Sequence, residues 1–370
     1  LTSARMDFYT ETKHAFFYGA TTIIGEDYVV RCREGFYNTD KKEGYFKKNA
    51  SIDYNNRNII GDSIYFNDTQ KYASATQNIR ITDTINNSFI TGNYGQVFKE
   101  KDSAMVTHRA LAINLVELDS LFIHADTLIA TGPPEQRIIR GFHDVRIFKE
   151  DLSGKTDSIH FNQTSGRAKL IRRPISDRDL QYLTPQEIAD RNPILWSDES
   201  QMTGDEIHLT IDNEKEVLDS LLIYNNAFVI EQDSLDAANF NQIKGLQLKG
   251  KFKGKSLETV DVIQNTEMVY YLYDDETQEL TGIDKAICSA LRLDFVDSGI
   301  EKITFFTNPD GVVYPPKELP ENTRQLLGFT WREDERIYSK EDLFHGIDLE
   351  NYSIKVKPGE IKGIPIELKR

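Results

Sequence analysis

The stretch Asp119-Ser-Leu-Phe-Ile-His-Ala-Asp-Thr-Leu128 carries a short motif that the chain repeats. The motif is a small residue or Thr, then Asp, then a hydroxyl or acidic residue, then Ile or Leu. An Asp before an alternating apolar run is typical of a turn that leads into a half-buried strand. Copies at irregular spacing therefore predict successive strands of one β architecture. The four full copies are Gly61-Asp62-Ser63-Ile64, Ala125-Asp126-Thr127-Leu128, Thr156-Asp157-Ser158-Ile159 and Gly204-Asp205-Glu206-Ile207.

The composition supports a β-rich protein with an acidic surface. The 370 residues are 39% hydrophobic and 11% aromatic, mostly Tyr and Phe, which favour strands. No apolar stretch has the length needed to cross a bilayer as a helix. With 59 acidic and 44 basic residues the formal net charge is -15. That charge argues against sequence-independent nucleic-acid binding, which depends on neutralising phosphates.

Alternating apolar residues and short polar connections predict strands along almost the whole chain. One interruption, 172–193, contains the capping box Thr184-Pro-Gln-Glu187 and predicts a short helix. We therefore predict two β units, 1–171 and 194–332, separated by this insert. A polar tail over 333–370 should be loosely held from Tyr338 onward. The predicted strands are 61–67, 72–83, 88–98, 104–116, 118–130, 137–149, 156–171, 203–211, 217–231, 243–253, 257–264, 267–273, 280–296 and 300–307.

Residues that could carry chemistry are sparse. His124 near Asp126, and His160 near Asp157, could serve in metal binding or acid–base catalysis. The pattern favours the simpler interpretation, polar side chains on the wet face of a sheet. No phosphate-binding glycine loop, zinc spacing or nucleophile elbow is present, so we predict no catalytic residue, no metal site and no cofactor.

The two cysteines and the N-terminus bear on the compartment. Cys32 and Cys288 are too far apart in the sequence to form a metal motif, and we expect two separate thiols. The chain starts at Leu1 and shows no signal-peptide pattern. We expect a processed or incompletely covered N-terminus, so the terminus does not define a compartment.

The positive signal is a row of apolar side chains at alternate positions of the predicted strands. An ordinary sandwich core and a trough that holds lipid both produce this alternation, so the pattern leaves the two open. The predicted inward or lipid-binding residues are Ile64, Phe66, Ile79, Ile81, Leu121, Ile123, Val145, Ile147, Ile159, Phe161, Ile207 and Leu209.

Several segments, taken in their order along the chain, resemble one family, the OstA-like proteins of Bacteroidota. These are relatives of LptA, LptC and the N-terminal domain of LptD, which carry lipopolysaccharide across the periplasm. The resemblance runs from Phe17-Tyr-Gly19 to Trp331-Arg332, and the 172–190 region departs from the pattern. The segments that carry it include Arg31-Cys-Arg-Glu-Gly-Phe-Tyr37, Gly61-Asp-Ser-Ile-Tyr-Phe66, Pro193-Ile-Leu-Trp196, Asn225-Asn-Ala-Phe228, Phe240-Asn-Gln-Ile-Lys-Gly245 and Gly328-Phe-Thr-Trp331.

The resemblance implies an all-β fold, an antiparallel β-jelly-roll shaped like a half-open taco, here as two LptA-like units joined end to end. It also implies a periplasmic protein in which lipid A acyl chains slide through the apolar interior. Each buried CH₂ is worth about 0.8 kcal/mol, so a continuous trough carries lipid at little cost. The implied partners are lipopolysaccharide and other Lpt-type β-jelly-roll proteins that dock on strand edges.

Three further interpretations stay open. A structural or adhesive β-solenoid would have a dry core and no bound lipid. A carbohydrate-active β-helix would need carboxylates clustered on one face, and the sequence shows no such cluster. The Asp-Ser/Thr-Leu/Ile triplets also resemble short O-glycosylation acceptors of Bacteroidota extracytoplasmic proteins, although most copies fall inside predicted strands.

Overall fold

The structure is a computed structural model that describes residues 1–346 except 116–119, 173, 213–216, 255, 275 and 297–298. Its internal contacts divide the chain into two compact units. This division does not fall at the predicted insert, since 172–193 lies inside the second unit. The first unit comprises 1–113, 127–134 and the described residues from Phe344 onward, and the second comprises 114–126 and 135–343.

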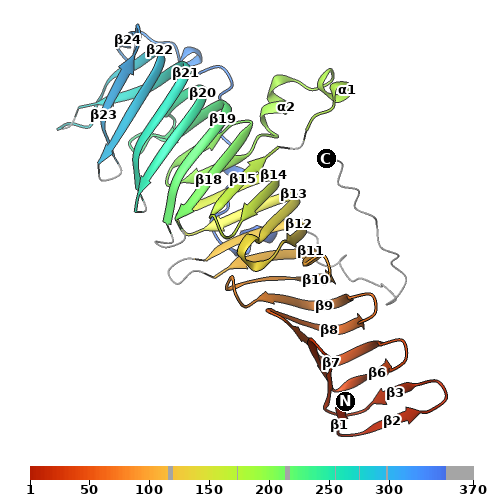
Figure 1. Ribbon diagram of the computed structural model, residues 1–370. Coiled ribbons are helices and arrows are strands. Elements are labelled where there is room, and N and C mark those ends of the chain that lie inside the picture. The colour runs from red at the N-terminus through yellow and green to blue at the C-terminus, as the bar shows by residue number, and fades with distance from the viewer. Residues whose placement is uncertain are drawn as a thin grey trace. The chain divides into compact units, whose positions relative to one another are not determined.

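Strands make up most of the first unit (Figure 1). Strand β12 (Leu121–Thr131) belongs to this unit only from Thr127 onward, and its earlier residues fall in the second unit. The other strands are β1 (Thr2–Ser3), β2 (Met6–Tyr9), β3 (His14–Phe17), β4 (Thr21–Ile24), β5 (Tyr28–Cys32), β6 (Glu34–Asn38), β7 (Glu43–Tyr54), β8 (Arg57–Asn67), β9 (Tyr72–Asp83), β10 (Ser88–Phe98) and β11 (Ser103–Asn114), whose last residue falls in the second unit.

The second unit has longer strands and the helical elements of the insert (Figure 1). Its strands are β13 (Ile138–Lys149), β14 (Leu152–Asn162), β15 (Arg167–Ile171), β16 (Ile194–Ser197), β17 (Ser200–Thr203), β18 (Glu206–Asp212), β19 (Val217–Gln232), β20 (Phe240–Lys253), β21 (Ser256–Tyr273), β22 (Leu280–Val296), β23 (Gly299–Phe306) and β24 (Asp310–Tyr314). The short helices are α1 (Asp177–Leu180), α2 (Pro185–Ala189), η1 (Pro134–Gln136), η2 (Glu321–Thr323), η3 (Glu333–Glu335) and η4 (Glu341–Phe344).

The predicted fold class is confirmed, because the chain is nearly all β and the pairings of the described strands within each unit are antiparallel. In the first unit the strands from β7 to β10 pair in chain order, whereas β3 pairs with β6 and β5 pairs with β7. Two predictions differ from the structure. The strand predicted over 156–171 is divided by a turn at 163–166 into β14 and β15. The strands predicted over 257–264 and 267–273 form the single strand β21. A bulge at Gln264 and Asn265 interrupts the alternation there, which made one strand look like two.

The repeated Asp motif has a role different from the one predicted. In every second long strand, two consecutive residues adopt positive φ angles and form a bulge, as at Gln77 (62°) and Asn78 (50°) of β9. The motif Asp lies on the adjacent strand, facing the bulge. Asp62 accepts a hydrogen bond from the Asn78 amide at 2.8 Å, and Asp205 accepts one from the Asn226 amide at 3.1 Å.

The prediction that these Asp residues open strands is therefore wrong for Asp62, Asp126 and Asp157, which lie within β8, β12 and β14. Asp157 lies beside the bulge residue His143, with 3.6 Å between carboxylate and imidazole. Asn, Asp, Gly and Lys serve both tight turns and left-handed bulges, so their presence alone does not distinguish the two. The motif marks the line along which the strands bend.

The helical insert lies inside one interrupted strand layer. Strand β14 pairs with β15 through Ser158–Asn162 and with β16 through Ser153–Lys155, so the insert leaves and returns to the same neighbour. The predicted capping box is confirmed: Thr184 caps α2, and Glu187 bonds back to the Thr184 backbone N–H at 2.7 Å. The insert therefore replaces, in this layer, the bulge found in other strands.

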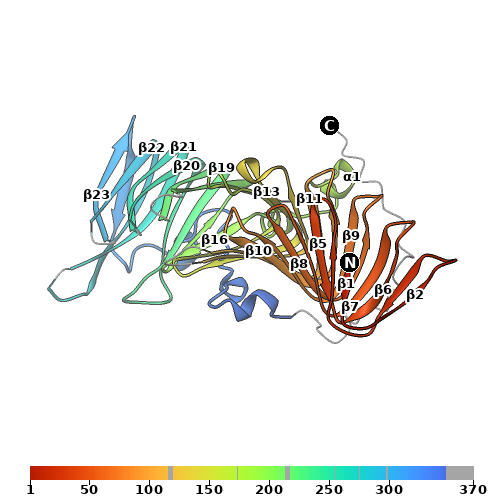
Figure 2. The ribbon, with the colours of Figure 1, turned by 60° about the horizontal axis from the view of Figure 1, so that its bottom comes forward.

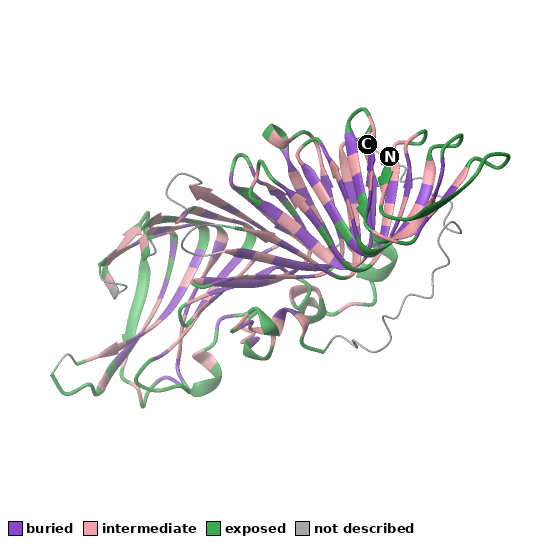
Figure 3. Ribbon diagram, turned by 90° about the horizontal axis from the view of Figure 1, so that it is seen from below, coloured by how far each residue is buried: buried purple, intermediate pink, exposed green. Residues whose placement is uncertain are grey.

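Buried and partly exposed residues alternate along the strands (Figure 3). Strand β13 shows the pattern on both sides of its bulge, with Val145 and Ile147 buried and Arg146 and Phe148 partly exposed. Burying one face of each strand stabilises the sheet at roughly 25 cal/mol for each Å² of apolar surface. This face forms the core of each unit.

A C-terminal strap, residues 315–343, packs on the other face of the second unit; it is the blue segment beneath the strands in Figure 2. Two buried glutamines hold its backbone. The Gln242 amide donates to the Arg324 carbonyl at 2.9 Å and accepts from the Leu326 N–H at 2.8 Å. The Gln201 amide donates to the Thr330 carbonyl and accepts from the Arg332 N–H, both at 2.7 Å.

The strap corrects the predicted polar tail. Residues from Tyr338 were expected to be loosely held, yet Leu343 is fully buried and Ile337 is 5% exposed. Alternation with the inward Val145 and Ile147 predicts that Arg146 faces water. Its guanidinium instead donates to the carbonyls of Asp342 and Leu343 at 3.4 and 3.3 Å. Ile337 and Leu343 belong to no alternating apolar run, so periodicity does not predict their burial. Residues 347–370 of the predicted tail lie outside the described residues.

Candidate functional site: the apolar interior

The twelve residues predicted to line an apolar interior are all buried. They sit on one face of their strands, with Ile59 opposite Ile81 in the first unit and Leu209 opposite Leu221 in the second. At Ile64, Val145 and Ile207 the exposed fraction is 0%. The interior at these positions is filled by protein side chains, and whether lipid also enters there stays a prediction.

Open space on the inner face lies further along the second unit. A cavity of about 70 Å³ lies between β17 and β23. It is lined almost entirely by aliphatic and aromatic side chains. Its walls include Met202, Leu221, Val229, Ile243, Leu248, Leu257, Val260, Val262, Leu293, Phe295 and Ile300.

None of these wall residues was among the predicted lipid-binding residues. They follow the same alternation, for example at Val260 and Val262 of β21, and the strands themselves were predicted. The parity of the inward positions changes at the bend of strands that lack a left-handed pair, as from Ile243 to Leu248 of β20, so the inward face cannot be followed across the bend by counting. Extending the row through β19 to β22 would have required the bulge positions.

One end of the cavity is polar. Glu231 accepts a hydrogen bond from the Asn241 amide at 3.3 Å, and Asn241 in turn accepts one from the Tyr271 backbone N–H at 3.0 Å. Burial raises the pKa of the Glu231 carboxyl, and nearby Asp233 and Asp198 act in the same direction. Burial also raises the pKa of Tyr270, and the Glu231 charge adds to that rise. The arrangement favours an uncharged polar group at this end of an apolar cavity.

The first unit has a smaller inner cavity, about 20 Å³, beside Tyr28, Ile52 and Phe66. Its acidic wall residue, Asp68, forms an ion pair with Lys71 at 2.7 Å. Burial raises the pKa of the Tyr28 hydroxyl far above its ordinary value, with a contribution from Tyr37. This cavity is smaller than the inner cavity of the second unit.

The histidines do not form a common site. His124 was expected on the wet face but is 1% exposed, because it lies in the middle of β12 where three consecutive residues are buried. His160 is exposed on β14, and burial of its surroundings lowers the pKa of its ring. Among the described residues no three His, Cys, Asp or Glu side chains gather closely enough to hold a metal ion.

Cys32 and Cys288 are both free and buried. Burial raises the pKa of the Cys32 thiol to about 11 and also raises that of Cys288. Neither thiol is therefore activated as a nucleophile near neutral pH. In the part of the chain that the structure describes, no helix has both the length and the apolar character to span a membrane.

Comparisons with known proteins do not identify a family for this chain. No protein-family model and no curated protein matches this chain. Similar solved structures include LptH from Pseudomonas aeruginosa, described as the LptA-homologous periplasmic component of the conserved lipopolysaccharide transport device. The match covers 29% of this chain and 76% of LptH, at 14% identity and a TM-score of 0.26. The fold assignment therefore rests on the strand pairings, and membership of the OstA-like family stays a prediction.

Proposed function

We propose that this protein binds the acyl chains of a lipid, of the lipopolysaccharide class, in the apolar interior of its bent β-sheet. The observation that carries the proposal is the inner cavity of the second unit, with its aliphatic walls and single polar end at Glu231 and Asn241. An acyl chain fits such a space because each CH₂ buried there is worth about 0.8 kcal/mol. The protein has no catalytic role in this proposal.

The row of buried residues extends the proposed path. Ile159 and Phe161 of β14, like Ile207 and Leu209 of β18, continue the same inner face away from the cavity. Lipid would pass there only if it displaced protein–protein contacts by equivalent apolar contacts. Such an exchange is nearly neutral in energy, because acyl chains and aliphatic side chains bury similar surface per atom.

The edges of the sheet support the proposed partners, other β-jelly-roll proteins of the Lpt type. Within the described residues β2 pairs only with β3, and it exposes Phe8 (45%) and Tyr9 (55%). Strand β24 pairs only with β22, and Val313 is 56% exposed. Both strands offer unpaired backbone groups to which another strand could add. A periplasmic location is part of the same proposal.

Photo-crosslinking tests the lipid proposal with neighbouring positions on opposite faces. A photoreactive residue at the buried Leu248 of β20 should capture lipopolysaccharide in cells, and one at the exposed Lys249 should not. A second pair, Ile159 and His160 of β14, tests whether lipid travels beyond the cavity. Capture at neither inner position would contradict the proposal.

A second function, a structural β protein with a dry core, is favoured by one observation, the complete burial of Ile64, Val145 and Ile207. Native mass spectrometry of the protein purified from its own membrane fraction separates the two functions. Lipid-sized mass additions that disappear on delipidation support the carrier. A mass equal to that of the bare chain supports the structural protein.

A further inference from the structure

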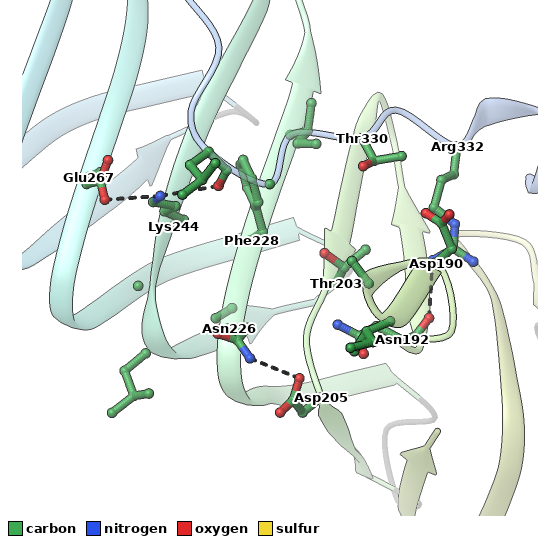
Figure 4. Close-up of a pocket in the computed structure, with 18 of the residues that line it drawn as sticks. Asp190, Asn192, Thr203, Asp205, Asn226, Phe228, Lys244, Glu267, Thr330 and Arg332 are labelled. Atoms are coloured by element: carbon green, nitrogen blue, oxygen red, sulfur yellow. Dashed lines mark hydrogen bonds and ion pairs between the residues drawn. The ribbon is translucent and has the colours of Figure 1, made fainter. Parts of the chain in front are cut away.

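A larger cavity, about 560 Å³, lies in the second unit along the line where its strands bend. Its floor is made by consecutive bend positions of neighbouring strands, at Asp205, Asn226, Leu246 and Asn265. The insert closes one side with Ile188–Asp190, and the strap closes another with Leu327, Thr330 and Arg332. Figure 4 labels Asp190, Asp205, Asn226, Thr330 and Arg332 among the side chains around the cavity.

This cavity is separate from the inner one, although the two share strands. On β19, Phe228 and Ile230 face the larger cavity, whereas Val229 and Glu231 line the inner cavity. Successive side chains of a strand point to opposite faces. The larger cavity thus lies on the strap-covered face of the sheet, away from the proposed acyl site.

Each of the three cations that line the larger cavity is already paired with a carboxylate. Lys244 lies 3.0 Å from Glu267, and Arg172 lies 3.5 Å from Asp205. The third cation, Arg332, is 2.7 Å from Glu335 of the strap. A site for phosphate or another anion would hold cations whose charge is not already neutralised. The pairing therefore argues against an anionic ligand.

The polar groups that remain can both donate and accept hydrogen bonds. Asn192, Asn226 and Asn265 contribute amides, and Thr203 and Thr330 contribute hydroxyls. Sugar hydroxyls are also donors and acceptors, so amides, hydroxyls and carboxylates match them well. The C–H faces of a sugar ring need apolar surface, which Ala189, Phe228 and Leu327 provide.

From this combination we infer that the cavity binds a neutral saccharide. Its volume falls within the range of roughly 300–1,000 Å³ usual for small-ligand sites, which is ample for a disaccharide. The saccharide is either a free oligosaccharide or the sugar portion of a glycolipid. The inference concerns a different face of the sheet from the acyl site and holds or fails independently of it.

Saturation-transfer NMR on the full chain tests the inference, with maltose, lactose and N,N′-diacetylchitobiose each at ~10 mM, a concentration that detects millimolar dissociation constants. At least one disaccharide should give a signal, and inorganic phosphate or glucuronate added as a competitor at the same concentration should displace it only weakly. No signal from any of the three overturns the inference. Full displacement of the disaccharide by phosphate or glucuronate also overturns it.

Two variants place the binding in this cavity. Ala189→Trp fills it from helix α2 and should weaken binding about tenfold or more, equivalent to ~1.4 kcal/mol. Ala237→Trp adds the same side chain at an exposed position of the β19–β20 connection and should bind as the unmodified protein does. Thr203→Val, nearly equal in size, removes one hydroxyl and should cost about threefold to tenfold. Unchanged binding by both Ala189→Trp and Thr203→Val overturns the assignment.

Dodecyl maltoside, used below its micelle concentration, identifies the source of the sugar. Binding tighter than that of maltose, and weakened by Ala189→Trp, supports a glycolipid. Equal binding of the two supports a free oligosaccharide. Loss of maltose binding in Ala189→Trp with crosslinking at Leu248 intact would show that the two sites act separately.

Discussion

The two units differ in what packs on the outer face of their antiparallel strands. In the first unit a ladder of half-buried aromatic rings crosses successive strands, from Phe16 through Phe36 and Tyr45 to Tyr65, with ring centroids 4.9–5.9 Å apart. In the second unit the strap covers that face over an apolar cluster that includes Phe228, Val269 and Leu326. One unit is stabilised by contacts between neighbouring strands, and the other by a segment distant in the sequence.

This difference can be measured because both tryptophans, Trp196 and Trp331, lie in the second unit. Tryptophan fluorescence therefore reports on the second unit alone. Amide hydrogen exchange reports on both units. A substitution that acts only on the first unit should therefore change hydrogen exchange there and leave the tryptophan unfolding midpoint unchanged.

The largest effect is expected for Gln242→Leu. The change removes both hydrogen bonds to the strap and leaves the buried Leu326 N–H without its acceptor, at a cost of about 2–4 kcal/mol. The fluorescence unfolding midpoint should fall, and strap amides should exchange faster. Gln247→Leu, on the exposed face of the same strand, should change stability by less than about 0.5 kcal/mol. Equal midpoints for the two variants would contradict the role assigned to Gln242.

Tyr45→Ala should destabilise the first unit only. It removes ring contacts with both Phe36 and Tyr65, each worth about 0.5–1.5 kcal/mol beyond the buried area. Amides of β7 and β8 should exchange faster while the tryptophan midpoint stays the same. Tyr182→Ala, at an aromatic residue 77% exposed in the insert, is the matched control. A shifted tryptophan midpoint in Tyr45→Ala would show that the units do not unfold separately.

The sequence predicted the strands far better than it predicted their bends. Alternation within each half-strand is a local property, so β9 and β10 appear at their predicted positions, 72–83 and 88–98. Two-residue bulges such as Gln77–Asn78 carry no signal that separates them from a hairpin turn. The Asp residues that face bulges, such as Asp62 and Asp205, are visible as a repeat in the sequence, but their partners lie on other strands. Recognising that pairing requires the register.

The candidate site was predictable only in part, for the same reason. The burial of Val145 and Ile147 follows from alternation, whereas the water exposure expected for Arg146 failed because the strap returns from almost 200 residues away. Both cavities combine groups from several strands with distant segments such as the strap. Their walls depend on contacts between residues far apart in sequence, and the local pattern of a single sequence gives no indication of these.

Removing the bulge-facing carboxylate should affect both units. Asp62→Ala in the first unit and Asp205→Ala in the second each remove a hydrogen bond to a left-handed Asn, at a cost of about 0.5–1.5 kcal/mol. Asp205→Ala also removes the 3.5 Å ion pair with Arg172, so its effect should be the larger of the two. Hydrogen exchange at Asn78 and Asn226 is the measurement. Asp40→Ala, at an exposed loop position, should have no effect. If hydrogen exchange changes at only one of these two Asn residues, the carboxylate does not stabilise the bend in both units.

The smallest expected effect is a pH dependence of the stability of the second unit. Glu231 lies in the second-unit cavity, where burial raises the pKa of its carboxyl. The folded state therefore holds this proton more tightly than the unfolded state. The contribution to stability is fully present below the unfolded pKa and is lost as pH rises through the folded pKa. Fluorescence unfolding measured from acid to neutral pH should show this decline.

Glu231→Gln tests that assignment, because glutamine keeps a carbonyl for the Asn241 amide and cannot ionise. The variant should match the unmodified protein at acid pH and be more stable than it at neutral pH. Glu276→Gln, at an exposed turn position, should leave the pH dependence unchanged. Lipid binding adds a further requirement, since an uncharged group is the better neighbour for an acyl chain. Glu231→Gln should then retain lipid at neutral pH at least as well as the unmodified protein, and weaker retention would show that the carboxylate itself contacts a polar group of the ligand.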